Sequence, residues 1–253
     1  MSIAEKLTTV AENIPKVYDA GYFKGLRDGW EEGNTEGWIN GRAEFYNEFW
    51  DSFIGITSFV SMFAGRMWND VTFKPKYDIV AKGQANQLFY SNGCSNIKQS
   101  LIDCGIELDL SQATQANQAF NYCYSLELPE IDLSNATRIQ GTFQDARRLV
   151  TIDKVTFKDD VTFQNTFSNI PTLENLTIGG TIGGSGFDIH WSTGLSAASL
   201  KSIIDALSTT TTDLIITLPT TAKSNYNANP PEGAPQTWEA LIATKPNWTY
   251  AYA

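Results

Sequence analysis

The chain has 253 residues, of which 42% are hydrophobic and 18% are charged, so it can bury a sizeable core and is not a disordered chain. Its net charge of −10 argues against nucleic acid or an anionic membrane as a main partner, because phosphate binding needs clustered lysine and arginine. Three cysteines and a single histidine, His190, fit neither a disulfide framework nor a zinc site, and we expect no metal and no cofactor.

The first residues carry an apolar stripe at heptad spacing. Its members are Ile3, Leu7, Val10, Ile14 and Val17. Because Pro15 interrupts a helix interior, we expect one short helix ending near Glu12 and a second one beginning near Pro15. The stripe is typical of a coiled coil between chains, and equally of one amphipathic helix that packs on its own domain.

A glycine ladder follows, with one glycine at every fourth position: Gly21, Gly25, Gly29, Gly33, Gly37 and Gly41. Large side chains stand directly after four of these glycines: Tyr22, Leu26, Trp30 and Trp38. Each glycine inside a helix costs about 1 kcal/mol relative to alanine, so an isolated helix could not form here. Glycines at this spacing let two helices approach closely. We therefore predict that residues 1–53 are a helical oligomerisation and attachment segment joining copies of the chain into a small homo-oligomer, with a trimer expected. A glycine-rich connector and packing on the chain's own body are the alternatives.

Neither a secretion signal nor a membrane span is recognisable in the sequence. The N-terminus lacks an apolar signal core, and the longest apolar-rich stretch, 53–68, contains Arg66 and several polar residues. That stretch is too short and too polar to cross a bilayer. We expect synthesis in the cytoplasm and no membrane insertion.

A repeat of 23 or 24 residues occupies the middle of the chain. Three stretches, 108–128, 131–152 and 155–178, share five columns: Leu110, Leu133 and Phe157; Thr114, Thr137 and Val161; Asn117, Gln140 and Gln164; Phe120, Phe143 and Phe167; and Leu126, Leu149 and Leu173. This period is within the leucine-rich-repeat range. It predicts short strands whose phenylalanine and leucine columns point into a stack, with the amide column bonding backbone groups. Cys94 and Cys123 are expected in a buried column of small residues with Ala146 and Ile170, as apolar side chains without a redox role.

The segments on either side of the repeats are predicted to close the stack. Before them, Phe63, Trp68 and Phe73 can cover the first apolar layer. After them, Ser196 is a candidate N-cap for a helix, 213–219 reads as a strand, 238–245 as a short helix that ends before Pro246, and 248–253 as a strand. The predicted fold is therefore α+β. It comprises a short leucine-rich-repeat-like solenoid over 54–253, with repeats over about 87–178 and an α/β C-terminal cap over 179–253.

The repeated pattern Phe-x-x-small-x-x-Leu, followed by Ile-Asp-Leu-Ser-x-x-Thr, resembles the BspA-type leucine-rich repeats of bacterial surface proteins. The opening MSIAEKLTTVAENIPKVYDAG and the later stretch 187–212 are similar to a wider group of gut Firmicutes proteins, many from prophage tail regions. The resemblance implies an adhesive or host-recognition role. Secreted members carry export signals and this sequence shows none, which favours a virion tail component, or an extracellular one released by lysis.

Motifs of catalysis are missing from the sequence: it contains no GxSxG, Walker or GxGxxG pattern. His190 and Trp191 could form a ligand-contacting loop, or they could be packed end-cap residues. Asp132 with Asp153, and Asp159 with Asp160, could act as hydrolytic carboxylates, or they could lie on a solvated face.

These observations favour a non-enzymatic binding or adhesion protein, most simply a phage tail-associated receptor-binding component. Its expected partners are copies of itself, a larger particle bound through the N-terminus, and a host cell-surface protein or glycan. The alternatives are a bacterial surface leucine-rich-repeat adhesin, a structural scaffold and a carbohydrate-active hydrolase.

Overall fold

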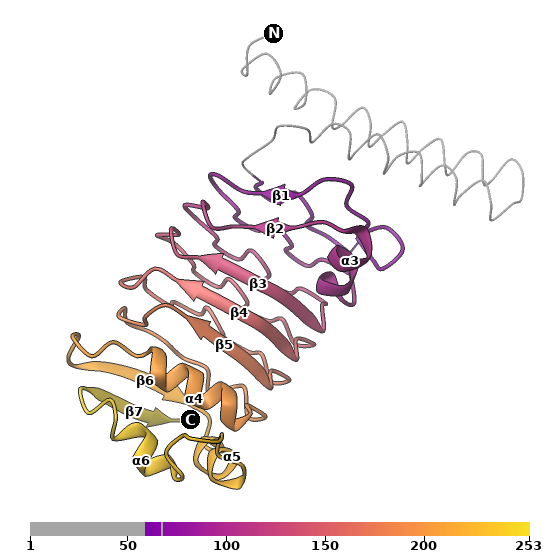
Figure 1. Ribbon diagram of the computed structural model, residues 1–253. Helices are drawn as coiled ribbons and strands as arrows, with labels where there is room; N and C mark the ends of the chain where they lie inside the picture. The colour runs from indigo at the N-terminus through magenta and orange to yellow at the C-terminus, as the bar shows by residue number, and fades with distance from the viewer. Residues whose placement is uncertain (1–58, 67) are drawn as a thin grey trace, which may run out of the picture. The chain divides into compact units, whose positions relative to one another are not determined.

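The computed structural model describes residues 59–66 and 68–253 (Figure 1). The larger of the two compact units into which the chain divides comprises residues 57–74 and 78–253, and the fold below is that of this unit. The N-terminal helices and the glycine ladder predicted from the sequence lie outside the described residues.

Short parallel strands and a few helices make up this unit. In chain order they are β1 (Ile79–Val80), α3 (Ile97–Cys104), β2 (Leu108–Asp109), β3 (Glu127–Leu133), β4 (Thr151–Phe157), β5 (Asn175–Gly179), α4 (Ala197–Ala206), β6 (Leu214–Leu218), α5 (Ala222–Ala228), α6 (Trp238–Ile242) and β7 (Trp248–Tyr252). The sheets pair β1 with β2, β3 with β4 and β5, and β6 with β7, always in parallel. No sheet among these elements closes into a barrel. The predicted mixture of helices and strands is confirmed.

The central sheet has a constant register. Glu127 pairs with Thr151, and Thr151 pairs with Asn175, so each step advances the chain by 24 residues. β3, β4 and β5 lie side by side in Figure 1, joined by irregular return segments instead of helices. Every third or second side chain of each strand is buried, as in the row Leu128, Ile152 and Leu176.

One phenylalanine from each return segment forms a continuous stack in the core. The rings of Phe89, Phe120, Phe143 and Phe167 follow one another at centroid distances of 5.3, 5.5 and 5.4 Å, with interplanar angles of 12–18°. All four side chains are fully buried. Offset stacking of aromatic rings adds about 0.5–1.5 kcal/mol per pair beyond the burial of their surface. The predicted phenylalanine column is therefore an inward-facing stack.

The return segments repeat the same backbone turn. Gln87, Gln118, Gly141 and Asn165 occupy equivalent places and all have φ between 55° and 61°. Four residues later a second left-handed position recurs at Ser91, Tyr122, Asp145 and Asn169. Left-handed backbone is costly for most residues, so its recurrence shows that the stack imposes the turn on each copy.

Amide side chains tie successive turns together. Asn86 Oδ1 accepts a hydrogen bond from the Asn117 backbone N–H at 2.9 Å, and Asn117 Oδ1 accepts one from the Gln140 N–H at 3.0 Å. The amide column predicted from the sequence is thus confirmed at Asn117, and it begins one turn earlier, at Asn86. These bonds satisfy backbone donors that no strand ladder would pair.

The prediction that Leu126 shares a buried column with Leu149 and Leu173 is wrong by one residue. The register places Ser125, not Leu126, in line with Leu149 and Leu173, and Leu126 is 38% exposed. The segment between Phe120 and β3 is one residue shorter than in the later turns. Ser125 can occupy the buried place because its hydroxyl accepts the Ile97 N–H at 2.9 Å and donates to the Glu127 carbonyl.

Both ends of the stack are closed by elements that the sequence largely predicted. Phe63, Trp68 and Phe73 are buried against one another, and Phe63 and Phe73 lie 5.3 and 5.4 Å from Phe89. At the other end, α4 begins after Ser196, whose side chain accepts the Ser199 N–H. The structure also confirms β6, α6 and β7.

Two helices were not predicted. One is α5, and the other is α3, which occupies the long return segment before β2. α3 is delimited by the Asn96 side chain, which accepts the Gln99 N–H, and by Gly105 at φ 66°, a left-handed position that suits glycine.

Replacing Phe143 with alanine is expected to lower the free energy of unfolding by about 3–5 kcal/mol, because the change opens a cavity between two stacked rings. Urea unfolding followed by far-UV circular dichroism measures this loss. Ile215→Ala, at a side chain that is 53% exposed, is the control and should cost less than about 1 kcal/mol. Equal losses of unfolding free energy in the two variants would show that the phenylalanine stack does not stabilise the core.

Candidate functional site

The outward side chains of β3, β4 and β5 form a polar surface, here called the strand face. Its residues are Glu127, Pro129, Glu130, Asp132, Thr151, Asp153, Lys154, Thr156, Asn175 and Thr177, all exposed or half-buried. Side chains within one row differ in chemistry. In the row that crosses the three strands at Glu127, the next members are Thr151 and Asn175.

Two lysines form ion pairs that hold side chains in place on the strand face. Lys98 of α3 donates to Asp153 at 2.7 Å and lies 3.8 Å from Glu127. Its hydrogen bond with Asp153 raises the pKa of Lys98. Lys154 contacts Glu130 at 2.6 Å across neighbouring strands. Exposed pairs such as these add little stability, about 0–1 kcal/mol each, but they orient four charged groups.

The carboxylates considered as hydrolytic pairs have other bonds. The register sets Asp132 opposite Thr156, not opposite Asp153, and Asp132 Oδ1 accepts the Ser134 N–H at 2.9 Å. Asp160 bonds Lys158. Asp159 and Asp160 do border an open hollow of about 390 Å³, with Asp205, Lys245 and a run of serine and threonine.

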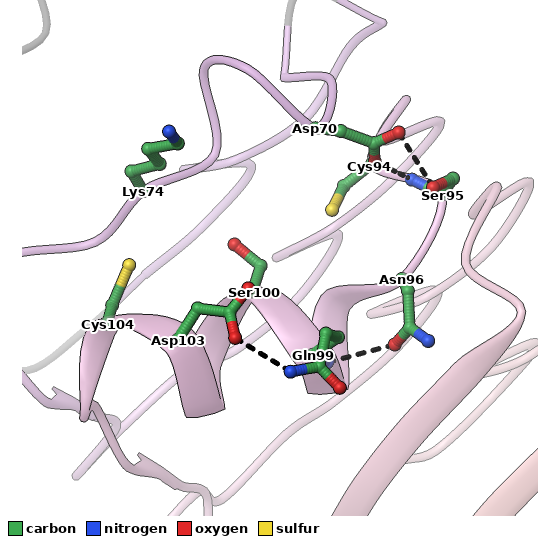
Figure 2. Close-up of a pocket in the computed structure, with 9 residues that line it drawn as sticks. All are labelled: Asp70, Lys74, Cys94, Ser95, Asn96, Gln99, Ser100, Asp103 and Cys104. Atoms are coloured by element: carbon green, nitrogen blue, oxygen red, sulfur yellow. Dashed lines mark hydrogen bonds between the residues drawn. The ribbon is translucent and has the colours of Figure 1, made fainter.

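A second hollow of about 300 Å³ lies beside α3 (Figure 2). Its lining consists of Asp70, Lys74, Cys94, Ser95, Asn96, Gln99, Ser100, Asp103 and Cys104. In Figure 2, Asp70 and Ser95 lie at one end and Lys74 with Cys104 at the other. Sequence reasoning missed this hollow, although Asn96 and Gly105 carry the capping signals of the helix that forms its wall.

Hydrogen bonds and burial determine the chemistry of this hollow. Burial alone would raise the pKa of Asp70, but hydrogen bonds from the Ser95 N–H and hydroxyl, at 2.5 and 2.7 Å, hold it below its usual value. Burial raises the pKa of Cys94 to about 12 and also raises that of Cys104. Both thiols are therefore protonated at neutral pH, whereas the reactive form of cysteine is the thiolate.

The burial predicted for Cys94 and Cys123 is confirmed, but the predicted column is wrong at Cys94. Asn92, which directly follows the left-handed position Ser91, lies in line with Cys123, Ala146 and Ile170. Cys94, Cys123, Ala146 and Ile170 are all at most 3% exposed, and both cysteines are free thiols. Burial also raises the pKa of Cys123 to about 12. These two residues act as small apolar side chains in the core.

His190 and Trp191 lie together near the C-terminal end of the stack. Their rings are 4.8 Å apart, and His190 Nδ1 is 2.6 Å from Asp188 Oδ1. Trp191 is 46% exposed, whereas the side chain of His190 is 24% exposed. A role for this pair in ligand binding stays a prediction. The oligomerisation residues of the glycine ladder lie outside the described residues.

The chain matches no protein-family model, no curated protein and no solved structure. Within 59–66 and 68–253, no three histidine, cysteine or acidic side chains gather as metal ligands would. Over the same residues, no helix combines the length and the apolar character that a membrane crossing requires.

Thiol labelling tests the burial of the cysteines. In the folded chain at pH 8, Cys104 should react with a maleimide while Cys94 and Cys123 react at least a hundredfold more slowly, because Cys104 alone of the three is not buried. In 8 M urea all three should react at one rate. Mass spectrometry of tryptic peptides identifies the labelled residues, and rapid labelling of Cys123 in the folded chain would contradict the packing of this column.

Proposed function

We propose that residues 54–253 form a short leucine-rich-repeat-like solenoid and that the chain is a non-enzymatic binding protein. In this proposal the strand face meets a ligand on a cell surface. The supporting observation is the contrast between constant buried rows, such as Leu128, Ile152 and Leu176, and varied outward rows, such as Glu127, Thr151 and Asn175. Repeat arrays use such outward rows as extended binding surfaces.

Pre-organisation supports the same function. The strand face rests on a core of stacked rings, and its charged groups are already oriented by Lys98 and Lys154. A ligand that binds there loses little free energy to the ordering of protein side chains. The candidate hydrolytic carboxylates Asp132 and Asp153 have structural partners, which favours binding over glycoside hydrolysis.

The setting that we propose follows from the resemblance to BspA-type and prophage tail-region proteins. Residues 1–53 would join copies of the chain and attach them to a larger particle, such as a phage tail. Several copies on one particle raise the avidity of a weak site by about 10²–10⁴-fold. A bacterial surface adhesin and a scaffold are the alternatives.

Blocking the strand face should abolish binding to cells. The variant Thr151→Arg/Asn175→Arg places two long side chains on a half-buried position of β4 and an exposed position of β5. It should reduce binding of the labelled full chain to intact gut Firmicutes cells at least tenfold, measured by flow cytometry. Ala228→Arg/Ala240→Arg adds the same charge to exposed positions of α5 and α6 and should bind like the parent chain.

Two results would contradict this proposal. One is equal cell binding by the two arginine variants. The other is release of reducing ends from the cells' wall polysaccharides by the parent chain, which would favour the hydrolase.

Light scattering tests the oligomer. The full chain is expected at three times its 28.0 kDa mass, and residues 54–253 alone at the mass of one copy, because the glycine ladder would be lost. A monomeric full chain would contradict the proposed assembly and favour the scaffold.

A further inference from the structure

Two arginines from distant parts of the chain meet at one tyrosine. The Arg66 guanidinium carbon lies 4.5 Å from the centre of the Tyr124 ring, and that of Arg148 lies 5.5 Å from it. Both arginines are exposed and Tyr124 is half-buried. We call these three residues the Arg–Tyr cluster. Tyr122, two residues before Tyr124, is 45% exposed.

Neither positive charge of the cluster is matched by an ion pair. Neither Arg66 nor Arg148 forms an ion pair with another residue in the described part of the chain. Asp70, which accepts two hydrogen bonds from Ser95, interacts with Arg148 only at longer range, and Asp145 pairs with Arg147 at 2.9 Å.

This arrangement is unusual in a chain of net charge −10. A contact between an exposed guanidinium and an aromatic ring contributes about 0.5–1 kcal/mol, and the two like charges repel each other. An anion bound to both guanidinium groups would remove that repulsion. Arginine presents a planar fork of N–H donors that matches a carboxylate or phosphate.

The surroundings favour a sparsely charged ligand with apolar faces. The acidic chain repels a polyanion such as nucleic acid, whose charges are closely spaced. In an acidic peptide, only an additional aromatic or proline side chain would supply a flat apolar face for the exposed ring of Tyr122 or for the 38% exposed Leu126. A sugar ring has such a face, and an acidic sugar carries the charge beside it.

We propose that the Arg–Tyr cluster binds an anionic saccharide, with its carboxylate or phosphate on Arg66 and Arg148 and its ring against Tyr122. This inference rests on the proposed binding function and adds to it a second surface with its own ligand class. The surface differs from the strand face, so the two can be tested separately.

Binding of the labelled full chain to immobilised polysaccharides tests the inference. The anionic probes are a mostly methyl-esterified polygalacturonate, in which only scattered rings keep a free carboxylate, and a phosphomannan; their neutral counterparts are fully methyl-esterified polygalacturonate and dephosphorylated mannan. We expect at least one anionic probe to bind tenfold or more tightly than its neutral counterpart. Added salt should weaken that binding, because exposed charges are screened.

Matched variants separate the cluster from general electrostatics. Arg66→Gln/Arg148→Gln should lower binding at least tenfold. Arg138→Gln/Arg147→Gln removes the same charge from exposed positions and should lower it less than twofold. Arg66→Lys/Arg148→Lys keeps the charge without the fork and should give an intermediate loss, with urea unfolding confirming that all variants fold.

Several outcomes would overturn the inference: no preference for either anionic probe, equal losses in the two glutamine variants, or tighter binding of polyglutamate or an oligonucleotide. If the Arg66→Gln/Arg148→Gln variant binds the anionic polysaccharides as the parent does, while Thr151→Arg/Asn175→Arg loses cell binding, the ligand class is wrong and the binding function stands. If the parent chain binds neither cells nor any of these polymers, both proposals fail.

Discussion

The contact between the core phenylalanine of one turn and that of the next is the interaction on which the rest of this structure depends. No single turn is large enough to enclose its own apolar side chains, so each one buries them against its two neighbours. The rings from Phe89 to Phe167 stack at nearly constant spacing, which requires the backbone to return to the same place each time. The recurrent left-handed positions and the 24-residue strand register follow from that requirement.

A fixed inner frame leaves the outer side chains free to differ. On the strand face, Glu127, Thr151 and Asn175 share one backbone position and have different chemistry. Elsewhere, two residues that are far apart in the sequence, Arg66 and Arg148, both contact the ring of Tyr124. Ion pairs on the strand face and ring contacts in the Arg–Tyr cluster orient the side chains of both surfaces, and this is the physical basis for proposing a binding protein.

Sequence reasoning succeeded where a side chain's role is repeated and failed where one turn departs from the rest. The phenylalanine column was predicted because three copies at regular spacing can hardly arise without a shared environment. Leu126 was misplaced because one residue is missing before β3, and only the hydrogen bonds of Ser125 reveal which residue takes the buried place. α3 was missed because its apolar face is short. The helix also occupies a return segment that is irregular in the other turns.

The sequence by itself determined the period, the phenylalanine column, the buried cysteines and, after Ser196, α4, β6, α6 and β7, because local spacing and capping signals encode them. Only the tertiary structure decided which outward residues share a surface, since contacts such as Lys98 with Asp153, or two arginines with Tyr124, depend on how many residues each turn contains. A change of one residue in a turn shifts the side chains around it relative to the neighbouring turns, as Ser125 and Leu126 show, and no local pattern records that shift.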